Sequence, residues 1–239
     1  MTRIHLPQAL DEGQLVELPP SAARHVLQVL RLGVGAPLTL FNGEGGEYAA
    51  ELLSVDRRKA VARVGAWRGV ERESPLALTL AQCVSRGERM DYTIQKAVEL
   101  GVRQIAPLIS ERTVVQIDAR RWARRSERWR GVIAAACEQC GRNRLPELSE
   151  VRQLAAWLRP AAGLRLVLDP DDGVPLASLR APAAVTLLVG PEGGLSADEL
   201  ALARRCGCVS VRLGPRVLRT ETAGVAASAA MQALWGDWR

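Results

Sequence analysis

Three short loops carry the residues whose types and spacing best suit a binding site. Each is expected to follow a buried strand: residues 169–173 read DPDDG, residues 190–194 read GPEGG, and residues 214–219 read GPRVLR. Glycine allows close backbone approach, and Gly-Pro turns held against a sheet present free N–H and C=O groups. Such a rim can read the edge of an adenine ring. The loops therefore predict a backbone-lined pocket for an uncharged or mildly cationic ligand.

Glu192, in the second of these loops, has two interpretations. Its carboxylate can form an ion pair with a positively charged group of a ligand. It can also compensate the N-terminus of a helix that begins near Ser196, where acidic side chains are stabilising. The sequence leaves both open.

Other familiar catalytic patterns are missing from the sequence. GPEGG is not followed by Gly-Lys-Ser/Thr, and no G-x-G-x-x-G opens a strand–helix unit, which disfavours a P-loop and a dinucleotide fold. The only histidines are His5 and His25, so a histidine base has few candidates. We expect buried thiols rather than a metal site or disulfides from the five cysteines, Cys83, Cys137, Cys140, Cys206 and Cys208.

Arginine dominates the positive charge. The net charge is +6, and 30 of the 32 basic residues are Arg, because the only lysines are Lys59 and Lys96. Residues 112–144 alone hold nine Arg against three acidic residues, a net +6. Trp122 and Trp129 interleave with these arginines. The stretch indicates either a solvated helix face with the Trp side chains packed inward or a surface for the RNA backbone.

Composition and length are those of a globular protein. The chain has 239 residues, 48% hydrophobic and 24% charged, enough for one large domain or two small ones. No apolar run reaches the roughly 18 residues that a membrane helix needs. The first residues lack the basic-then-apolar pattern of a secretion signal, so we expect a cytoplasmic protein without a membrane partner.

The elements that must position the loops fall into two sets. Residues 1–72 predict a small β-rich unit of short strands with Gly-rich turns, a helix over 21–32 and a small barrel. A charged segment ending at Pro75 predicts the linker. From there strands and helices alternate, with helices over 90–100, 120–140, 151–158, 196–205 and 221–234. That alternation predicts an α/β domain over 73–239 with a parallel sheet covered on both faces.

Three motifs resemble one known family when they are read in order. Residues 138–143 read EQCGRN, residues 188–196 read LVGPEGGLS, and residues 213–223 read LGPRVLRTETA. They closely resemble the bacterial 16S ribosomal RNA uridine N3-methyltransferases, of the SPOUT or α/β-knot superfamily. Residues 1–72, with Arg3, the helix around His25 and the hairpin at 41–43, look like the family's PUA-like RNA-binding domain.

The resemblance implies a SPOUT trefoil-knotted parallel sheet built from the three loops and preceded by the PUA-like domain. In that family the knot binds S-adenosyl-L-methionine, which leaves as S-adenosyl-L-homocysteine, and the enzyme is a homodimer. No metal is expected. By position, the residues implied to line the cofactor are Leu188, Gly190, Glu192, Gly193, Leu213, Gly214, Val217 and Leu218.

The implied reaction sets a chemical requirement. Uracil N3 carries a proton and is a poor nucleophile at pH 7, so the enzyme must remove that proton or stabilise the resulting anion. We expect Arg142 to stabilise the anion, Asn143 to orient the base, and Arg219 to be the next candidate for Arg142's role. Glu138 is the expected carboxylate, although a salt bridge to Arg142 at i+4 explains it equally well.

The expected partner is 16S rRNA or the small ribosomal subunit. The candidate RNA contacts are Arg3, Arg24, Lys96, Arg121, Arg124 and Arg125. Two alternatives stay open: a non-enzymatic RNA-binding or ribosome-assembly factor with a vestigial knot, and a SPOUT enzyme that methylates tRNA or a ribose hydroxyl.

Overall fold

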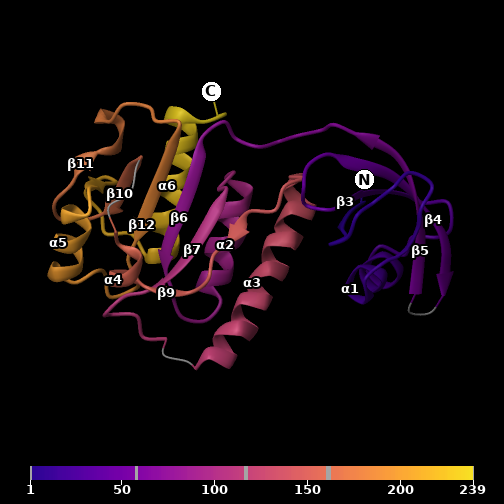
Figure 1. Cartoon of the computed structure of the whole chain (residues 1–239), viewed down its shortest axis with the longest axis horizontal. Coiled ribbons are helices and arrows are strands. Elements are labelled where there is room, and N and C mark those ends of the chain that lie inside the picture. The colour runs from indigo at the N-terminus through magenta and orange to yellow at the C-terminus, as the bar shows by residue number, and fades with distance from the viewer. Residues whose placement is uncertain (1, 57–58, 116–117, 160–162, 239) are drawn as a thin grey trace. The chain divides into compact units, whose positions relative to one another are not determined.

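The computed structural model describes residues 2–56, 59–115, 118–159 and 163–238 (Figure 1). Two compact units divide the chain. One contains Met1–Glu73 and Ala134–Leu145, and the other contains Ser74–Ile133 and Pro146–Arg239. One boundary between the units lies after Glu73. The assignment of Ala134–Leu145 to the first unit differs from the prediction of a single domain over 73–239, because this segment is bonded into the first unit as described below.

The first unit is built on a five-stranded sheet in the order β1-β3-β4-β5-β2. The β1–β3 pair is parallel and the other pairs are antiparallel. Alternating side chains such as Leu38, Leu40, Leu52 and Val64 are buried between this sheet and the adjacent helical turns. Its strands are β1 (Thr2–His5), β2 (Leu15–Glu17), β3 (Pro37–Phe41), β4 (Glu47–Asp56) and β5 (Lys59–Arg68).

The helix expected over 21–32 is shorter and irregular. α1 (Pro20–Arg24) is followed directly by a π-helical turn, η1 (His25–Val29), and the chain leaves it through Arg31 with φ of 52°. Val26 is buried in the core while Val29 is 65% exposed. The apolar pattern therefore predicted the buried face but not the wider turn.

The second unit contains a parallel sheet in the order β11-β13-β10-β12-β6-β7-β8, with β9 also paired to β7. This confirms the expected α/β class. The strands are β6 (Ala77–Cys83), β7 (Gln104–Ile109), β8 (Glu147–Leu148), β9 (Arg152–Gln153), β10 (Leu164–Leu168), β11 (Val174–Pro175), β12 (Ala184–Val189) and β13 (Cys208–Arg212). The helices are α2 (Arg89–Glu99), α3 (Ala119–Cys140, which continues into the first unit), α4 (Leu154–Trp157), η2 (Leu176–Ser178), α5 (Ala197–Arg205) and α6 (Thr220–Trp235).

The helix expected over 151–158 is largely replaced. Residues 152–153 extend beside β7, and only α4 remains helical. By contrast, α5 begins where its sequence predicts, because Ser196 and Glu199 form a reciprocal capping box.

Small residues let α6 lie close to the sheet. Gly224 is buried, and a Cβ there would lie 3.0 Å from Oε1 of Gln82 and 3.6 Å from Leu80. Ala227 and Ser228 are buried on the same helix. This close packing places the first turn of α6 beside the carboxyl end of β12, where Thr220 donates to the Gly190 carbonyl at 2.6 Å.

Neither a membrane helix nor a metal cluster is found in the described part of the chain. In it, no helix has both the length and the apolar character to cross a bilayer, and no three His, Cys, Asp or Glu side chains are grouped to hold a metal ion. Three of the cysteines, Cys83, Cys137 and Cys208, are buried thiols, and burial raises the pKa of Cys83 and Cys137 to about 12.

Candidate active site

A cavity of about 550 Å³ opens where the carboxyl ends of β10, β12 and β13 meet. Parallel strands in register bring their carboxyl ends to one edge of a sheet, which is where open α/β folds bind ligands. The three loops predicted from sequence all contribute. Their lining residues are Asp169, Pro170, Asp171, Gly190, Pro191, Glu192, Gly193, Gly194, Leu213, Gly214, Arg216, Val217, Leu218 and Arg219.

Seven of the eight residues expected to line the cofactor do line this cavity: Gly190, Glu192, Gly193, Leu213, Gly214, Val217 and Leu218. Leu188 does not. Its side chain is 1% exposed and belongs to the apolar core of the sheet, because successive side chains of a strand point to opposite faces and that of Leu188 points into the core.

Backbone geometry makes glycine necessary at two of these positions. A Cβ on Gly190 would lie 3.1 Å from both Cγ and the backbone N of Leu195, so a larger side chain would open the turn. Gly214 has φ of +72°, which side chains rarely adopt. The shape of the cavity rim therefore depends on the main-chain conformation of the turns at Gly190 and Gly214.

Asp169 fixes the first loop from inside. It is 3% exposed, and its Oδ1 accepts the backbone N–H groups of Asp171 and Asp172 at 3.1 and 3.2 Å. Its Oδ2 accepts from the Arg204 guanidinium of α5 at 2.8 Å. Both carboxylate oxygens are thus occupied in shaping the loop.

Arg89, at the start of α2, lies between two carboxylates of the cavity wall. Its Nη1 donates to Oε1 of Glu192 at 3.1 Å, and its Nε lies 3.6 Å from Oε1 of Glu221. Glu192 also accepts the Arg86 backbone N–H at 2.9 Å. Burial raises the pKa of Glu192, but these donors outweigh it and the net pKa is lowered. The Glu192 carboxylate is therefore charged, and its Oε1 accepts from both Arg86 and Arg89.

Glu221 differs from Glu192. It lines the cavity from the first turn of α6, its side chain is 16% exposed, and its Oε2 is buried with no hydrogen-bond partner among the described residues. A buried carboxylate oxygen without a donor is unusual in a folded protein.

Arginines supply the positive charge of the cavity wall. Arg112 is anchored, since its Nη1 donates to the Gly193 carbonyl at 2.9 Å. Arg219 is exposed, lines the cavity, and has no side-chain hydrogen bond or ion pair within the described ranges. Its guanidinium is available to an incoming anion.

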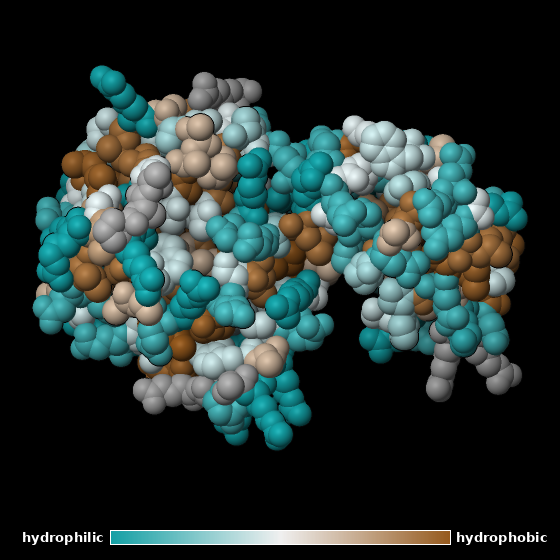
Figure 2. All heavy atoms as spheres, viewed as in Figure 1, coloured by the Kyte–Doolittle hydropathy of each residue, from teal (hydrophilic) through white to brown (hydrophobic). Residues whose placement is uncertain are grey.

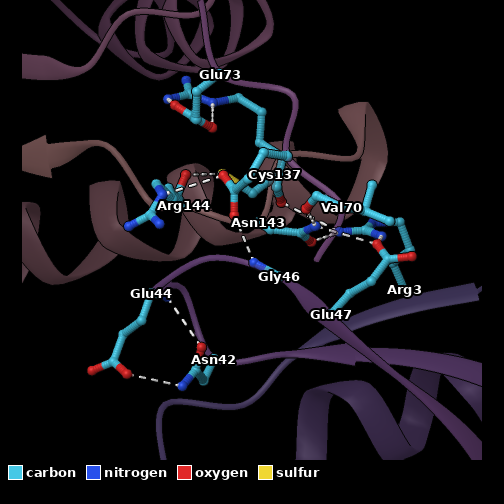
Figure 3. A network of polar contacts seen from close by, with 12 residues as sticks. Arg3, Asn42, Glu44, Gly46, Glu47, Val70, Glu73, Cys137, Asn143 and Arg144 are labelled. Atoms are coloured by element: carbon cyan, nitrogen blue, oxygen red, sulfur yellow. Dashed lines mark hydrogen bonds and ion pairs between the residues drawn. The ribbon is translucent and has the colours of Figure 1, made fainter. Parts of the chain in front are cut away.

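The other three residues expected to act in catalysis, Glu138, Arg142 and Asn143, belong to the first unit, whereas every residue lining the cavity belongs to the second. Asn143 is part of the polar network of the first unit that Figure 3 shows. Asn143 is fully buried, accepts from Arg3 and donates to the Val70 carbonyl at 2.6 Å. Arg3 is also paired with Glu47 at 2.5 Å.

Arg142 is held as firmly as Asn143. It is 3% exposed, and its Nε and Nη2 donate to the two carboxylate oxygens of Glu73 at 2.9 and 2.5 Å. Glu138 accepts the backbone N–H of His5 at 2.9 Å. These contacts attach Ala134–Leu145 to the first unit.

The candidate RNA contacts differ in their exposure to solvent and in their ion pairs. Arg24 and Arg124 are exposed, while Arg3 is only partly exposed and paired with Glu47, and Lys96 is paired with Glu99 at 2.7 Å. Arg121 lies 3.9 Å from Asp118. Arg125 stacks near Trp122 and Trp129, 6.0 and 5.8 Å from the ring centroids.

Sequence reasoning missed Arg89, Arg112 and Glu221 as parts of the site. Arg89 follows β6 and Arg112 follows β7, so both come after strands that end at the same edge of the sheet, a signal the sequence did contain. The sequence predicts Glu221 only as part of a helix start, because nothing local separates a first-turn carboxylate that stabilises a helix from one that faces a cavity.

Both units contain residues that match known protein families. Residues 72–232 match the model of an RNA methyltransferase domain, and residues 18–65 match that of an RNA methyltransferase PUA domain, which confirms the PUA-like prediction. A ribosomal RNA small subunit methyltransferase E of Buchnera aphidicola from Schizaphis graminum is 32% identical, over 98% of this chain and 97% of that protein. The Bacillus subtilis protein of the same name is 28% identical, over 94% and 92%.

Solved structures of related proteins match nearly the whole chain. The ribosomal RNA small subunit methyltransferase E of Neisseria gonorrhoeae, bound to S-adenosyl methionine, superposes with a TM-score of 0.91 at 41% identity and full coverage of both chains. The Legionella pneumophila protein Lpg2936, in complex with the same cofactor, has a TM-score of 0.95 at 44% identity, covering 99% and 98%. The chain belongs to the family of ribosomal RNA small subunit methyltransferases E.

Proposed function

We propose that this protein uses S-adenosyl-L-methionine to methylate N3 of a uridine in 16S rRNA. The observation that carries the proposal is the cavity at the carboxyl ends of β10, β12 and β13, with main-chain groups, carboxylates and a free guanidinium around it. Solved relatives that match nearly the whole chain are bound to this cofactor.

The residues of the cavity fit the cofactor. Its volume of about 550 Å³ is in the range of small-molecule sites. Leu213, Val217 and Leu218 provide apolar walls, and the turns at Gly190 and Gly214 provide main-chain groups suited to an adenine edge. Bound there, the cofactor supplies a sulfonium methyl group, transferred as the C–S electron pair passes to sulfur.

The chain's own residues must make N3 nucleophilic. Loss of the N3 proton leaves a negative charge that spreads onto O2 and O4 of the base, and a guanidinium fork stabilises such an anion. We assign this role to Arg219, which lines the cavity and is free. Arg142 was expected to fill this role, but we do not assign it there because its guanidinium is buried and paired with Glu73. Glu138, Arg142 and Asn143 are assigned to holding the segment 134–145 in place.

The Arg-rich part of α3 is proposed as an RNA contact. Figure 2 shows hydrophilic side chains gathered at the end of α3 where the chain enters that helix. Trp129 is fully buried, so the aromatic side packs inward and the arginines point out. Arg124 has no carboxylate partner in the part of the chain that the structure describes, which leaves its charge for a phosphate. Arg24 is a second exposed candidate.

Two further features implied by the resemblance stay proposals: a trefoil knot and a homodimer. β10 lies between β12 and β13 although it precedes both in the chain, an order compatible with threading of the three loops. Val217 at the cavity rim is 80% exposed, and Trp238 is 55% exposed, leaving apolar surface for a second copy. Sedimentation equilibrium tests the dimer.

Transfer of a labelled methyl group tests the proposed function. We expect label from S-adenosyl-L-methionine in 16S rRNA when the protein is incubated with small ribosomal subunits or with naked 16S rRNA, and none in tRNA. Label in tRNA alone would replace the rRNA proposal. Cofactor binding without transfer to any RNA would favour a non-enzymatic factor.

A further inference from the structure

We infer that Arg212 and Arg216 bind backbone phosphates of the RNA next to the target uridine. The inference rests on the proposed function and identifies what holds the sugar–phosphate backbone of the substrate beside the reacting base. It starts from the charges on the cavity wall.

More positive than negative charge on this wall is left without an ion pair. The charged lining residues are the arginines Arg89, Arg112, Arg212, Arg216 and Arg219 and the carboxylates Asp169, Asp171, Glu192 and Glu221. Arg89 is balanced by Glu192 and Glu221, and Asp169 by an arginine of α5. Within the described part of the chain, Asp171 is then the one carboxylate of the wall without an ion pair, against four such arginines. The cavity therefore suits a ligand that brings negative charge.

Arg212 and Arg216 are the arginines of the wall with the fewest commitments. Both are exposed, and no described residue is hydrogen-bonded to either side chain. By contrast, Arg112 donates to the Gly193 carbonyl at 2.9 Å, and Arg219 is the proposed partner of the uracil oxygens. Two solvent-accessible guanidinium groups thus remain to be explained.

The backbone places these two side chains at the edge of the cavity. Arg212 is the last residue of β13, and Arg216 lies in the turn that follows. A Cβ on Gly214 would lie 4.0 Å from Nη2 of Arg216, so this guanidinium reaches back over the turn that forms the rim. Gly214 itself lines the cavity. An anion at the rim is therefore within reach of Arg216.

A phosphate fits these arginines better than the cofactor does. S-adenosyl-L-methionine carries a sulfonium and an ammonium group against one carboxylate, so it is a net cation, and further unpaired cations around it are unfavourable. RNA brings a negative charge with every nucleotide. The planar guanidinium fork donates two parallel hydrogen bonds to phosphate oxygens.

The reaction itself brings phosphates to this place. N3 lies on the Watson–Crick edge of uracil, so the base must leave its stack to be methylated, and its sugar and flanking phosphates come with it. Arg216 and Arg219 are three positions apart in the loop 214–219, and both line the cavity. This one loop would then hold the uracil through Arg219 and the adjoining backbone through Arg216.

Arg216→Gln tests the inference, because it removes the charge and keeps a polar side chain of similar shape. The protein is saturated with S-adenosyl-L-homocysteine, which prevents transfer, and titrated with 16S rRNA at several salt concentrations. We expect the Kd to rise about tenfold, as for a lost hydrogen bond to a charged group, and the log–log salt slope to fall by about 0.7–0.9. Adding Arg212→Gln should lower the slope by a similar amount again.

Two further measurements separate a phosphate contact from other roles. Cofactor affinity by calorimetry, and the methylation rate at saturating rRNA, should stay near wild type in Arg216→Gln, because the contact holds the RNA and not the reacting atoms. Arg205→Gln removes the same charge from an exposed position of α5 outside the cavity, and should leave the Kd and the slope nearly unchanged.

Weaker cofactor binding with unchanged RNA binding in Arg216→Gln would overturn the inference, since the anion would then be the carboxylate of the cofactor. An unchanged Kd and salt slope would overturn it as well. A methyl group found on an atom other than N3 would instead defeat the proposed function, and the binding titrations would still decide whether these arginines contact phosphate.

Discussion

Arg142 is a side chain whose burial and pairing define its role. Removing one member of a buried ion pair leaves the other charged and unpaired, which costs about 3–5 kcal/mol. We therefore expect Arg142→Met to lower the free energy of unfolding by roughly that amount, measured by urea denaturation. The double variant Glu73→Gln/Arg142→Met should recover most of the loss. Full stability together with lost methyl transfer in Arg142→Met would instead assign Arg142 to catalysis.

Arg219 is expected to behave in the opposite way, because its guanidinium is exposed and free. Arg219→Ala should leave stability and cofactor affinity nearly unchanged but reduce single-turnover methyl transfer by about 10²–10³, or roughly 2.7–4 kcal/mol, as for other single anion-stabilising donors. Arg219→Lys should recover little, since a point charge does not reproduce the fork. The exposed Arg205→Ala on α5 is the matched control, and an equal loss there would count against the assignment.

The sequence predicted which loops form the cavity better than it predicted which side chains point into it. The Gly-Pro loops specify turns, and seven of the eight residues expected to line the cofactor lie on the cavity wall. Leu188 does not, and Glu221 lies there without having been expected, because whether a side chain faces a core or a cavity depends on strand register and helix rotation. Arg142 and Asn143, expected to act in catalysis, are buried and bonded within the first unit, which sequence patterns did not indicate.

The short segment 134–145 is an element whose attachment depends on charge. Burial raises the pKa of Glu47, but hydrogen bonds from Arg3 and Asn143 outweigh it, and the net pKa is below the ordinary value of 4.5. A carboxyl group with a depressed folded-state pKa contributes stability above its unfolded pKa and loses that contribution as the pH falls through the folded value.

Glu47→Gln should therefore destabilise the protein near pH 7, and the difference from wild type should shrink as the pH falls below about 4.5. Urea denaturation at a series of pH values from about 7 to about 3 measures it. The exposed Glu12→Gln serves as the control. A difference that stays constant across this range would show that packing, and not the charge of Glu47, stabilises the network.

α3 is the element on which the RNA proposal can be tested. Replacing Arg121, Arg124 and Arg125 together by Glu should weaken rRNA binding and flatten its dependence on salt. The log–log slope should fall by about 0.7–0.9 for each phosphate that the protein no longer neutralises. Titrations at several salt concentrations measure the slope, and Arg205→Glu controls for net charge. An unchanged slope would show that this face of α3 is only solvated.

Element boundaries were predictable where local chemistry is decisive. The capping box of α5 and the apolar strands of the sheet fall where the sequence predicts. The π-helical turn η1, the strand β9 and the attachment of residues 134–145 to the first unit did not follow from the sequence. Each depends on partners distant in the chain or on a backbone geometry with no composition signal.

At the scale of the whole molecule, periodicity predicted two units and a parallel sheet but not the strand order. The order β13-β10-β12-β6 determines that the three loops meet at one cavity. Strand order arises from packing between distant segments, which local patterns do not encode. The chemistry of the cavity then follows from which side chains those loops leave free.

The central claim is that this cavity directs a methyl group to uracil N3. The most direct measurement is mass spectrometry of nucleosides from 16S rRNA, taken from small subunits of a strain lacking the enzyme and treated with the protein and S-adenosyl-L-methionine. We predict that 3-methyluridine appears at a single site, and that Arg219→Ala greatly reduces it. A methylated ribose or another methylated base in its place would contradict the account.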